Sequence, residues 1–249
     1  MFKSAALLLA TLSLLSCSTP KGATARASET ASSMAAPTTT TAASTTLTPS
    51  ALEADVLREL NLLRANPKGY AAILRSWSGR YDGKILRAPG QSRAIQTVEG
   101  EAALDEAIAV VEAAGDAHTM TWTDALSVAA NDHVKAQGAT RTIGHRGEDG
   151  SNSLQRISRH GRSRGRSAEV IDYGWRDARS IVIDLLVDDG IADRGHRRAL
   201  LDPLYTTAGV SCGSHARYGL MCVVEMAERY EPFPLTPPAP PPVTIAAAR

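Results

Sequence analysis

Apolar residues recur at helical spacing early in the chain, at Leu52, Val56, Leu60 and Leu63. The pattern stops at Asn66-Pro67, because proline disfavours a helical conformation in the residue before it. Asn66 can cap a new helix that carries Pro67 in its first turn. The pattern therefore predicts two short helices that meet at a corner near residue 66.

Further helical patterns cover residues 101–114, 124–137 and 177–188, the last of which ends near Gly190. The helix over 124–137 has one face made of Leu126, Ala130, His133 and Gln137. A short strand is predicted over 167–173, and two strands rich in Val, Leu, Met and Cys over 208–212 and 219–226. These elements predict an α+β fold whose sheet is filled late in the chain.

The first 16 residues have the pattern of an export signal. Lys3 precedes an apolar run from Ala5 to Leu15, which is shorter than the roughly 20 apolar residues that span a bilayer as a helix. Ser16 then stands directly before Cys17, which resembles the lipobox of bacterial lipoproteins. We therefore expect Cys17 to become the acylated first residue of the mature protein. The alternative is an ordinary signal peptide with an incidental cysteine.

Residues 17–50 and 232–249 contain few of the large apolar side chains that form a packed core. From Ser18 to Ser50, 27 of 33 residues are Ser, Thr, Ala or Pro, which predicts a disordered tether after the lipidated cysteine. From Pro232 to Pro242, seven of eleven residues are proline, which favours an extended tail. The folded domain is therefore predicted over residues 51–231, a length that suits one domain.

The charges of the chain are nearly balanced, with 27 Lys and Arg against 26 Asp and Glu. This balance gives no indication of a polyanionic partner, and we expect no nucleic-acid binding. One cluster departs from the balance: Arg156, Arg159, Arg162, Arg164 and Arg166. Because glycines and serines intervene and no aromatic residue is present to stack on a base, we interpret this cluster as a solvated loop.

Two cysteines remain after Cys17 is assigned, Cys212 and Cys222. An exported protein meets an oxidising compartment, which favours a disulfide between them across a hairpin. Two buried free thiols are the alternative.

Two histidines stand in segments that are rich in glycine and arginine rather than in apolar residues. His145 lies between Gly144 and Arg146, and His196 between Gly195 and Arg197. Between them in the sequence come Glu169, in the short strand, and Asp188, at the end of an apolar helix stripe. An acid in such a position needs a partner, since burial of an unpaired carboxylate is costly.

These four side chains could hold a divalent metal such as zinc, with one position open for water. They could equally form a hydrogen-bonded cluster without a metal. In both cases His145 and His196 are expected to face each other closely enough to share one ion or one water molecule.

The ordered motifs resemble a bacterial branch of the CAP superfamily, the cysteine-rich secretory, antigen 5 and pathogenesis-related proteins. They are Leu60-Asn61-x-x-Arg64-x-Asn66-Pro67-x-x-Tyr70-Ala71, Ala129-Ala130-Asn131-Asp132-His133, Gly144-His145-x-Gly147-x-Asp149-Gly150-Ser151, Ala168-Glu169-x-Ile171-x-Tyr173-Gly174, Asp188-Asp189-Gly190-x-x-x-Arg194-Gly195-His196-Arg197, and Gly209-Val210 leading into Cys212 and Cys222. The resemblance covers nearly all of Ala51 to Tyr230.

The resemblance implies a three-layer α-β-α sandwich with a cleft that holds two histidines and two acidic residues. His145, His196 and Glu169 match three of these four, and Asp188 is our choice for the fourth. The family's Gly-Glu-Asn-Ile reads Ala168-Glu169-Val170-Ile171 here, so a polar side chain beside the acid is missing. Aspartate also replaces the usual glutamate at 188, which leaves Asp189 as the alternative inward-pointing acid.

Our first functional expectation is a non-enzymatic binding module, held at the membrane of the cell envelope through Cys17 and facing away from the cytoplasm. Its cleft would bind a divalent metal and a lipid or small ligand, as the resemblance implies for some members. The alternative is a metal-assisted hydrolase of peptides or wall polymers, with Glu169 as general base. A third interpretation is a structural envelope protein whose cleft no longer binds anything.

Overall fold

The computed structural model describes residues 50–234. The predicted signal peptide, the lipidation of Cys17 and the tether lie outside these residues, as does nearly all of the predicted tail. Among the described residues, no helix is long and apolar enough to cross a membrane.

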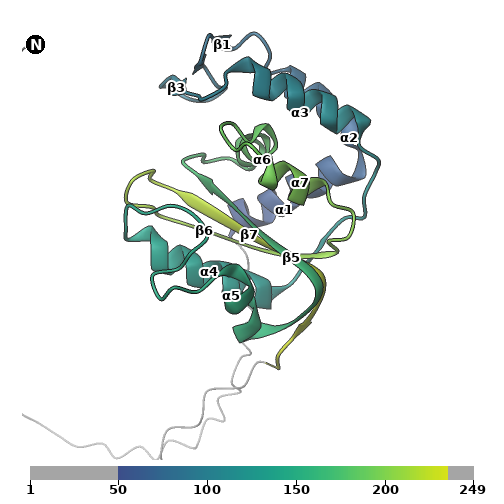
Figure 1. The fold of residues 1–249 in the computed structure, drawn as a ribbon, viewed down its shortest axis with the longest axis vertical. Helices are drawn as coiled ribbons and strands as arrows, with labels where there is room; N and C mark the ends of the chain where they lie inside the picture. Colours follow the sequence, from purple (N-terminus) through teal and green to yellow (C-terminus); the bar gives the residue numbers. More distant parts are fainter. Residues whose placement is uncertain (1–49, 235–249) are drawn as a thin grey trace, which may run out of the picture. The chain divides into compact units, whose positions relative to one another are not determined.

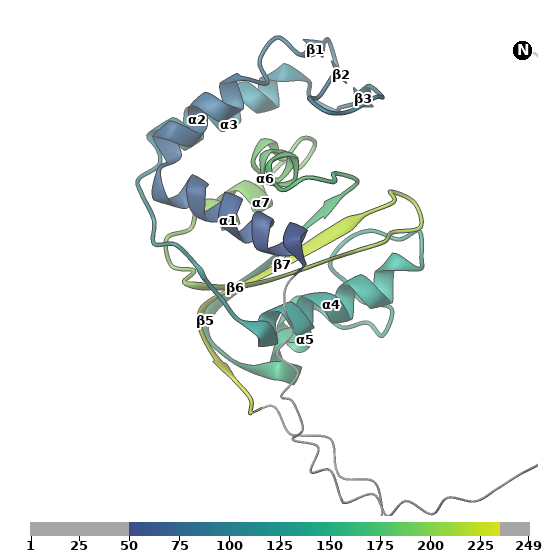
Figure 2. The same cartoon turned by 180° about the vertical axis from the view of Figure 1, so that it is seen from behind.

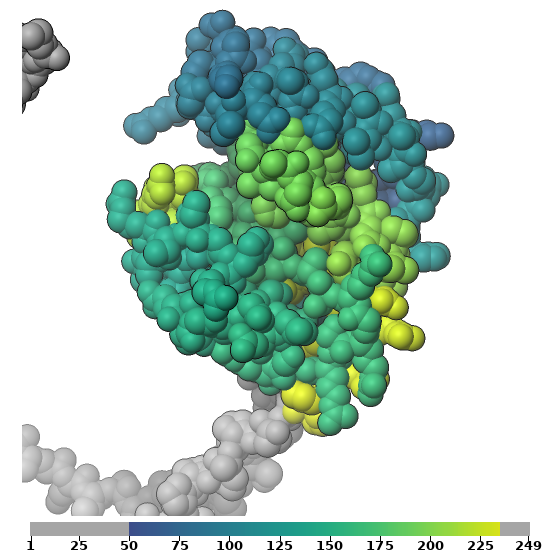
Figure 3. Space-filling view, in the orientation of Figure 1, coloured from purple at the N-terminus to yellow at the C-terminus, as the bar shows by residue number. Residues whose placement is uncertain are grey.

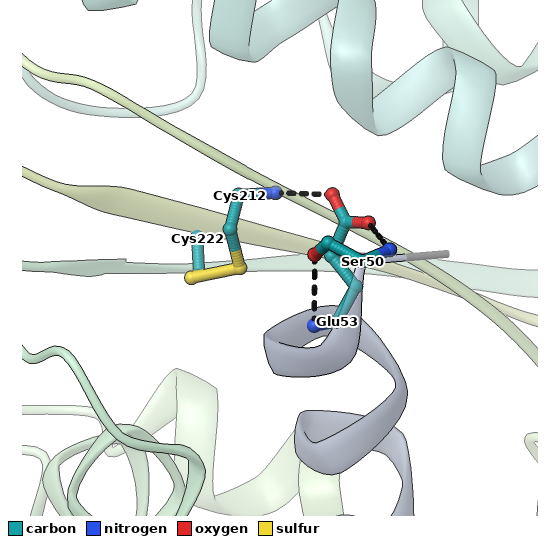
Figure 4. Close-up of a disulfide and its surroundings, with 4 residues drawn as sticks. All are labelled: Ser50, Glu53, Cys212 and Cys222. Atoms are coloured by element: carbon teal, nitrogen blue, oxygen red, sulfur yellow. Dashed lines mark hydrogen bonds between the residues drawn. A yellow bond between two sulfur atoms is a disulfide. The ribbon is translucent and has the colours of Figure 1, made fainter. Parts of the chain in front are cut away.

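The predicted corner near residue 66 is present between helices α1 (Ala51–Ala65) and α2 (Pro67–Arg75). The side chain of Asn66 accepts a hydrogen bond from the backbone N–H of Gly69 at 2.8 Å, which caps α2 as the sequence indicates. At the other end of α1, Ser50 and Glu53 form a reciprocal capping box. The spare oxygen of the Glu53 carboxylate accepts from the backbone N–H of Cys212, which ties the start of α1 to the sheet (Figure 4).

The remaining helices are α3 (Glu101–Ala113), α4 (Asp124–Gly138), α5 (Ser153–His160), α6 (Ala178–Val187) and α7 (Gly195–Leu201). The predicted face of α4 is buried along its whole length, including His133 and Gln137. α3, α4 and α6 agree with the predicted helices to within about one residue at each end.

The strands form two sheets. A small antiparallel sheet contains β1 (Tyr81–Asp82), β2 (Ile85–Leu86) and β3 (Ile95–Gln96). The main sheet has the order β4-β6-β7-β5 and contains β4 (Thr121–Trp122), β5 (Gly161–Tyr173), β6 (Thr207–Gly213) and β7 (Met221–Pro232). β7 lies between β5 and β6 and is antiparallel to both, whereas β4 is parallel to β6.

Helices cover both faces of the main sheet, so the fold is the expected α-β-α sandwich. Figures 1 and 2 show α4 and α5 on one face and α1, α6 and α7 on the other. The side chains of β7 alternate accordingly: Val224 packs into the core beneath α1 and α6, whereas Val223 packs against α4. Buried on both faces, β7 is apolar along most of its length.

Cys212 and Cys222 are directly opposite each other on β6 and β7 and form a disulfide, as the sequence predicts. Figure 4 shows this bond beside the first turn of α1. The disulfide therefore joins the two strands of the β6–β7 hairpin covalently. The hydrogen bond from Cys212 to Glu53 joins this hairpin to α1.

The prediction that the arginine cluster is a loop is wrong, although all of its members except Arg156 are exposed to solvent. Arg156 and Arg159 lie on α5, and the other three lie on the first half of β5, which begins six residues before the predicted strand. This half of β5 forms a ribbon with the end of β7, where Arg164 pairs with Glu231. Backbone pairing rather than an apolar face builds the ribbon, so the hydrophobic pattern gave no signal for it.

Candidate functional site

A cleft with a volume of about 580 Å³ lies where β5, the end of α6 and the start of α7 meet the small sheet. Its walls are mainly apolar and aromatic, with Trp77, Leu86, Ile171, Tyr173, Ile183 and Ile191 among them. Figure 3 shows the surface hollowed between the blue segment that carries the small sheet and the teal and yellow segments below it. His145, Asp188 and His196 line this cleft, whereas Glu169 lies behind His145.

His145 is presented by a loop whose backbone is anchored at the preceding residue. The carbonyl oxygen of Gly144 accepts hydrogen bonds from His133 and Gln137 on α4, each at 2.9 Å. The N–H of Gly144 donates to the hydroxyl of Tyr173 on β5, also at 2.9 Å. Gly144 has φ of 101°, a conformation that favours glycine, so the loop geometry requires glycine directly before His145.

The His145 ring is held from behind by a buried ion pair. Its Nδ1 lies 2.9 Å from Oε1 of Glu169, while the other oxygen of Glu169 accepts from Arg156. The side chains of Glu169 and Arg156 are both 1 % exposed, whereas that of His145 is 53 % exposed. Burial would raise the pKa of Glu169, but the hydrogen bond from His145 and the charge of Arg156 outweigh it and lower the pKa.

A second buried acid, Glu225 on β7, stands next to Glu169 in the sheet register. One of its oxygens accepts from the hydroxyl of Ser153 at 2.7 Å, and the other is unpartnered among the described residues. Burial, and then the charge of Glu169, raise the pKa of Glu225 well above its usual value. Of the two acids, Glu225 is thus the one whose protonated form is favoured, and Glu169 the one whose ionised form is favoured.

His196 is held from the opposite layer by Asp188. Its Nδ1 lies 2.7 Å from Oδ1 of Asp188, and the other oxygen of Asp188 accepts from the backbone N–H groups of His196 and Arg197. The carboxylate thus caps the start of α7 and orients the ring at the same time. Asp188 ends α6 with φ of 55°, in the left-handed region, which turns its side chain back toward α7.

The choice between Asp188 and Asp189 is decided by these contacts. Asp189 accepts from the backbone N–H groups of Val98 and Glu99 and so fixes the loop before α3. Asp188 is the carboxylate that contacts a histidine.

The two imidazoles face each other across the cleft, with ring centroids 6.1 Å apart and planes inclined by 43°. Each uses Nδ1 to contact its carboxylate, which leaves Nε2 of both rings without a hydrogen-bond partner in residues 50–234. The structure thus brings the four predicted side chains together as two carboxylate–imidazole pairs, one from each helical layer.

This arrangement fits a metal ion only in an open form. Histidines that bind metals are commonly oriented by a carboxylate on the other ring nitrogen, as both are here. However, no group of three or more His, Cys, Asp or Glu side chains in the described part of the chain is placed to hold an ion. His145 and His196 would supply two nitrogen ligands, and the remaining positions would fall to water or ligand, unlike a closed structural zinc site.

The described lining of the cleft offers neither a serine or cysteine nucleophile nor Glu169 as a general base. Among the described lining residues, none is Ser or Cys, and the hydroxyl of Thr97 donates to the carbonyl oxygen of Lys84 at 2.7 Å. Both oxygens of Glu169 are engaged, and its side chain is 1 % exposed. Glu169 is therefore not placed to take a proton from a water molecule in the cleft.

Arg156 and Glu225 support the site but were not identified from the sequence. The sequence pattern places Arg156 in one cluster with four exposed arginines, and nothing in the pattern separates it from them. Glu225 did carry a signal, because a single acid within the apolar run Met221-Cys222-Val223-Val224 must be paired or protonated when buried.

Comparisons with known proteins place this architecture in a family. No curated protein matches the chain. An outer surface protein of Borrelia burgdorferi is 22% identical to this chain, with a TM-score of 0.38. The match covers 45% of this chain and 78% of the Borrelia protein. An extracellular protein with an SCP domain from Bacillus anthracis is 17% identical, with a TM-score of 0.37. This match covers 45% of this chain and 35% of the Bacillus protein. The model of the cysteine-rich secretory protein family, CAP, matches residues 57–226, well over half of the chain, and the chain therefore belongs to that family.

Proposed function

We propose that this chain is a non-enzymatic binding module, held at the cell envelope through Cys17 and facing away from the cytoplasm. Its cleft binds a divalent metal ion at His145 and His196, and a lipid or small ligand along the apolar walls. The observation that carries the proposal is the facing pair of imidazoles, each fixed through Nδ1, at an apolar cavity of about 580 Å³.

The carboxylates of Glu169 and Asp188 support metal binding by orienting the two histidine rings, and they do not coordinate the ion themselves. Glu169 and Asp188 are almost fully buried, each 1 % exposed, and each contacts Nδ1 of its histidine. They hold Nε2 of both rings toward one volume, so that two nitrogens are available without rearrangement. A bound zinc ion would supply an open coordination position for an electron-pair donor on the ligand.

The hydrolase alternative has less support. With Glu169 as general base, as expected from the sequence, it needs that carboxylate in contact with water in the cleft, whereas Glu169 is buried with both oxygens engaged. The rigid support of His145 would serve a fixed ligand-recognition site as well as it would serve the active site of a hydrolase.

The envelope location is supported by two features of the chain. The export signal and Ser16-Cys17 favour an acylated, exported protein. The Cys212–Cys222 disulfide is typical of an oxidising compartment.

Calorimetric titration of the full-length protein with zinc at pH 7 tests the binding proposal. Wild type should take up one ion, and both His145→Ala and His196→Ala should lose at least about tenfold in affinity, since each removes one of two nitrogens. His118→Ala is the matched control, because His118 is exposed and does not line the cleft. No uptake by wild type, or equal affinity in all four proteins, would contradict the proposal.

A further inference from the structure

A second pair of acids, Asp172 and Asp184, lies beside the cleft. Asp184 is one helical turn before Asp188 on α6. Asp172 on β5 faces the layer of α6, is 1 % exposed, and has no hydrogen-bond donor for either carboxyl oxygen among the described residues. Asp184 on α6 lines the cleft, is accessible to solvent there, and lies next to Asp172. Neither side chain contributes to the carboxylate–imidazole pairs.

The two carboxyl groups divide one proton between them unequally. Burial, and then the charge of Asp184, raise the pKa of Asp172 well above its usual value. The surrounding protein raises the pKa of Asp184 as well, although its side chain reaches solvent, whereas hydrogen bonds from Trp175 and then from Asp172 act in the opposite direction. Asp172 is buried and Asp184 reaches solvent at the cleft, so Asp184 is the better placed of the two acids to carry negative charge.

The cleft as a whole is acidic. Asp184, Asp188 and Asp189 line it, and none of its described lining residues is Lys or Arg. Asp188 is engaged with His196 and Asp189 with two backbone N–H groups. Asp184 is the carboxylate left to receive a cationic group from a ligand.

The walls around Asp184 are apolar and aromatic. Ile183 and Leu185 flank it on α6, and Trp77 and Tyr81 line the same cavity. Burial, and then the charges of Asp189 and Asp184, raise the pKa of Tyr81 to about 12. Aromatic faces near a carboxylate favour an organic cation, which gains from cation–π attraction as well as from the ion pair.

We propose that the cleft selects an amphiphile with a positively charged amine, whose ammonium group contacts Asp184 and whose hydrocarbon part lies along the apolar walls. This inference rests on the proposed function, in which the cleft is the ligand site. Three carboxylates and no lysine or arginine in the lining disfavour an anionic lipid such as a fatty acid. The lack of three converging ligands among the described residues disfavours a bare metal ion at Asp184.

Three probes with the same ten-carbon chain test the inference: decylammonium, decanol and decanoate, each titrated calorimetrically below its micelle concentration into the full-length protein at pH 7. Wild type should bind decylammonium at least about tenfold more tightly than decanol, and decanoate most weakly, as a charge-assisted contact implies. Asp184→Asn should remove the preference for the amine and leave decanol binding unchanged.

Two further variants serve as controls. Asp172→Asn keeps the charge of Asp184 and can still donate to it, so the preference for the amine should persist. Asp116→Asn removes an exposed carboxylate outside the cleft and should bind all three probes as wild type does.

The outcomes separate this inference from the proposed function. Decanol binding without an advantage for the amine, or a preference that survives Asp184→Asn, would overturn the inference while leaving the cleft a ligand site. If neither zinc nor any of the three probes binds wild type, both the inference and the proposed function are wrong.

Discussion

Glu169 on β5 and Glu225 on β7 are direct partners in the antiparallel register, and both side chains are buried behind His145. Two ionised carboxylates in this position would repel each other strongly. Arg156 pairs with Glu169, and burial together with the charge of Glu169 raises the pKa of Glu225, which favours its protonated form. These properties of the buried network behind His145 lead to the first two predictions.

Glu225→Gln should make the folded protein more stable than wild type at neutral and alkaline pH. The pKa of Glu225 is raised on folding, so wild type loses stability as the pH rises above about 4.5, the ordinary value for glutamate. The loss is at most about 1.4 kcal/mol per pH unit and continues until the pKa of the folded state is reached. Glutamine keeps the shape of the side chain and removes this dependence.

Urea unfolding between pH 5 and pH 9 measures the effect as the change in free energy of unfolding with pH. The exposed Glu148→Gln is the control and should follow the wild-type slope. A wild-type slope in Glu225→Gln as well would show that Glu225 does not hold a proton in the folded state.

Arg156→Met should destabilise the protein by about 3–5 kcal/mol, because it leaves the carboxylate of Glu169 buried without its charged partner. Arg159→Met on the same helix removes an arginine whose side chain is 45 % exposed, and it should cost less than about 1 kcal/mol. Addition of Glu169→Gln to Arg156→Met should restore part of the loss. Equal losses for the two arginine variants in urea unfolding would refute the buried ion pair.

Cys17 should be acylated when the full-length chain is expressed in a bacterium that processes lipoproteins. Wild type is expected to incorporate radiolabelled palmitate, and Cys17→Ala is not. More than one acyl chain on a single residue gives lasting membrane attachment, since one chain alone binds only marginally. Equal labelling of wild type and variant would favour the ordinary signal peptide.

The sequence predicts most of the fold because its helices bury apolar stripes. α1, α3, α4 and α6 each show such a stripe, and the capping of α2 by Asn66 follows from local chemistry alone. α5 gave no such signal, since its buried residues are Ile157 and the charged Arg156. The strands of the small sheet have only two residues each, too few for an alternating pattern.

The four cleft residues and the facing of the two histidines are expected from the motifs, whereas the pairing of each carboxylate with one ring nitrogen is not. The sequence favours Asp188 and leaves Asp189 as the alternative, and the contact of Asp188 with His196 decides between them. It also leaves open whether the acids are metal ligands or hydrogen-bond partners, and both carboxylates contact Nδ1 of a histidine. Such differences depend on which side of a ring faces the cleft, which a linear sequence does not encode.

The central claim, that His145 and His196 form one site through Nε2, is tested most directly by nitrogen-15 NMR of the imidazole rings. Before zinc is added, both rings should show Nδ1 hydrogen-bonded to a carboxylate. As zinc is titrated into the full-length protein, the Nε2 resonances of both rings should shift together with one stoichiometry, and Nδ1 should move much less. A shift confined to one ring, or to histidines outside the cleft such as His118, would contradict the account.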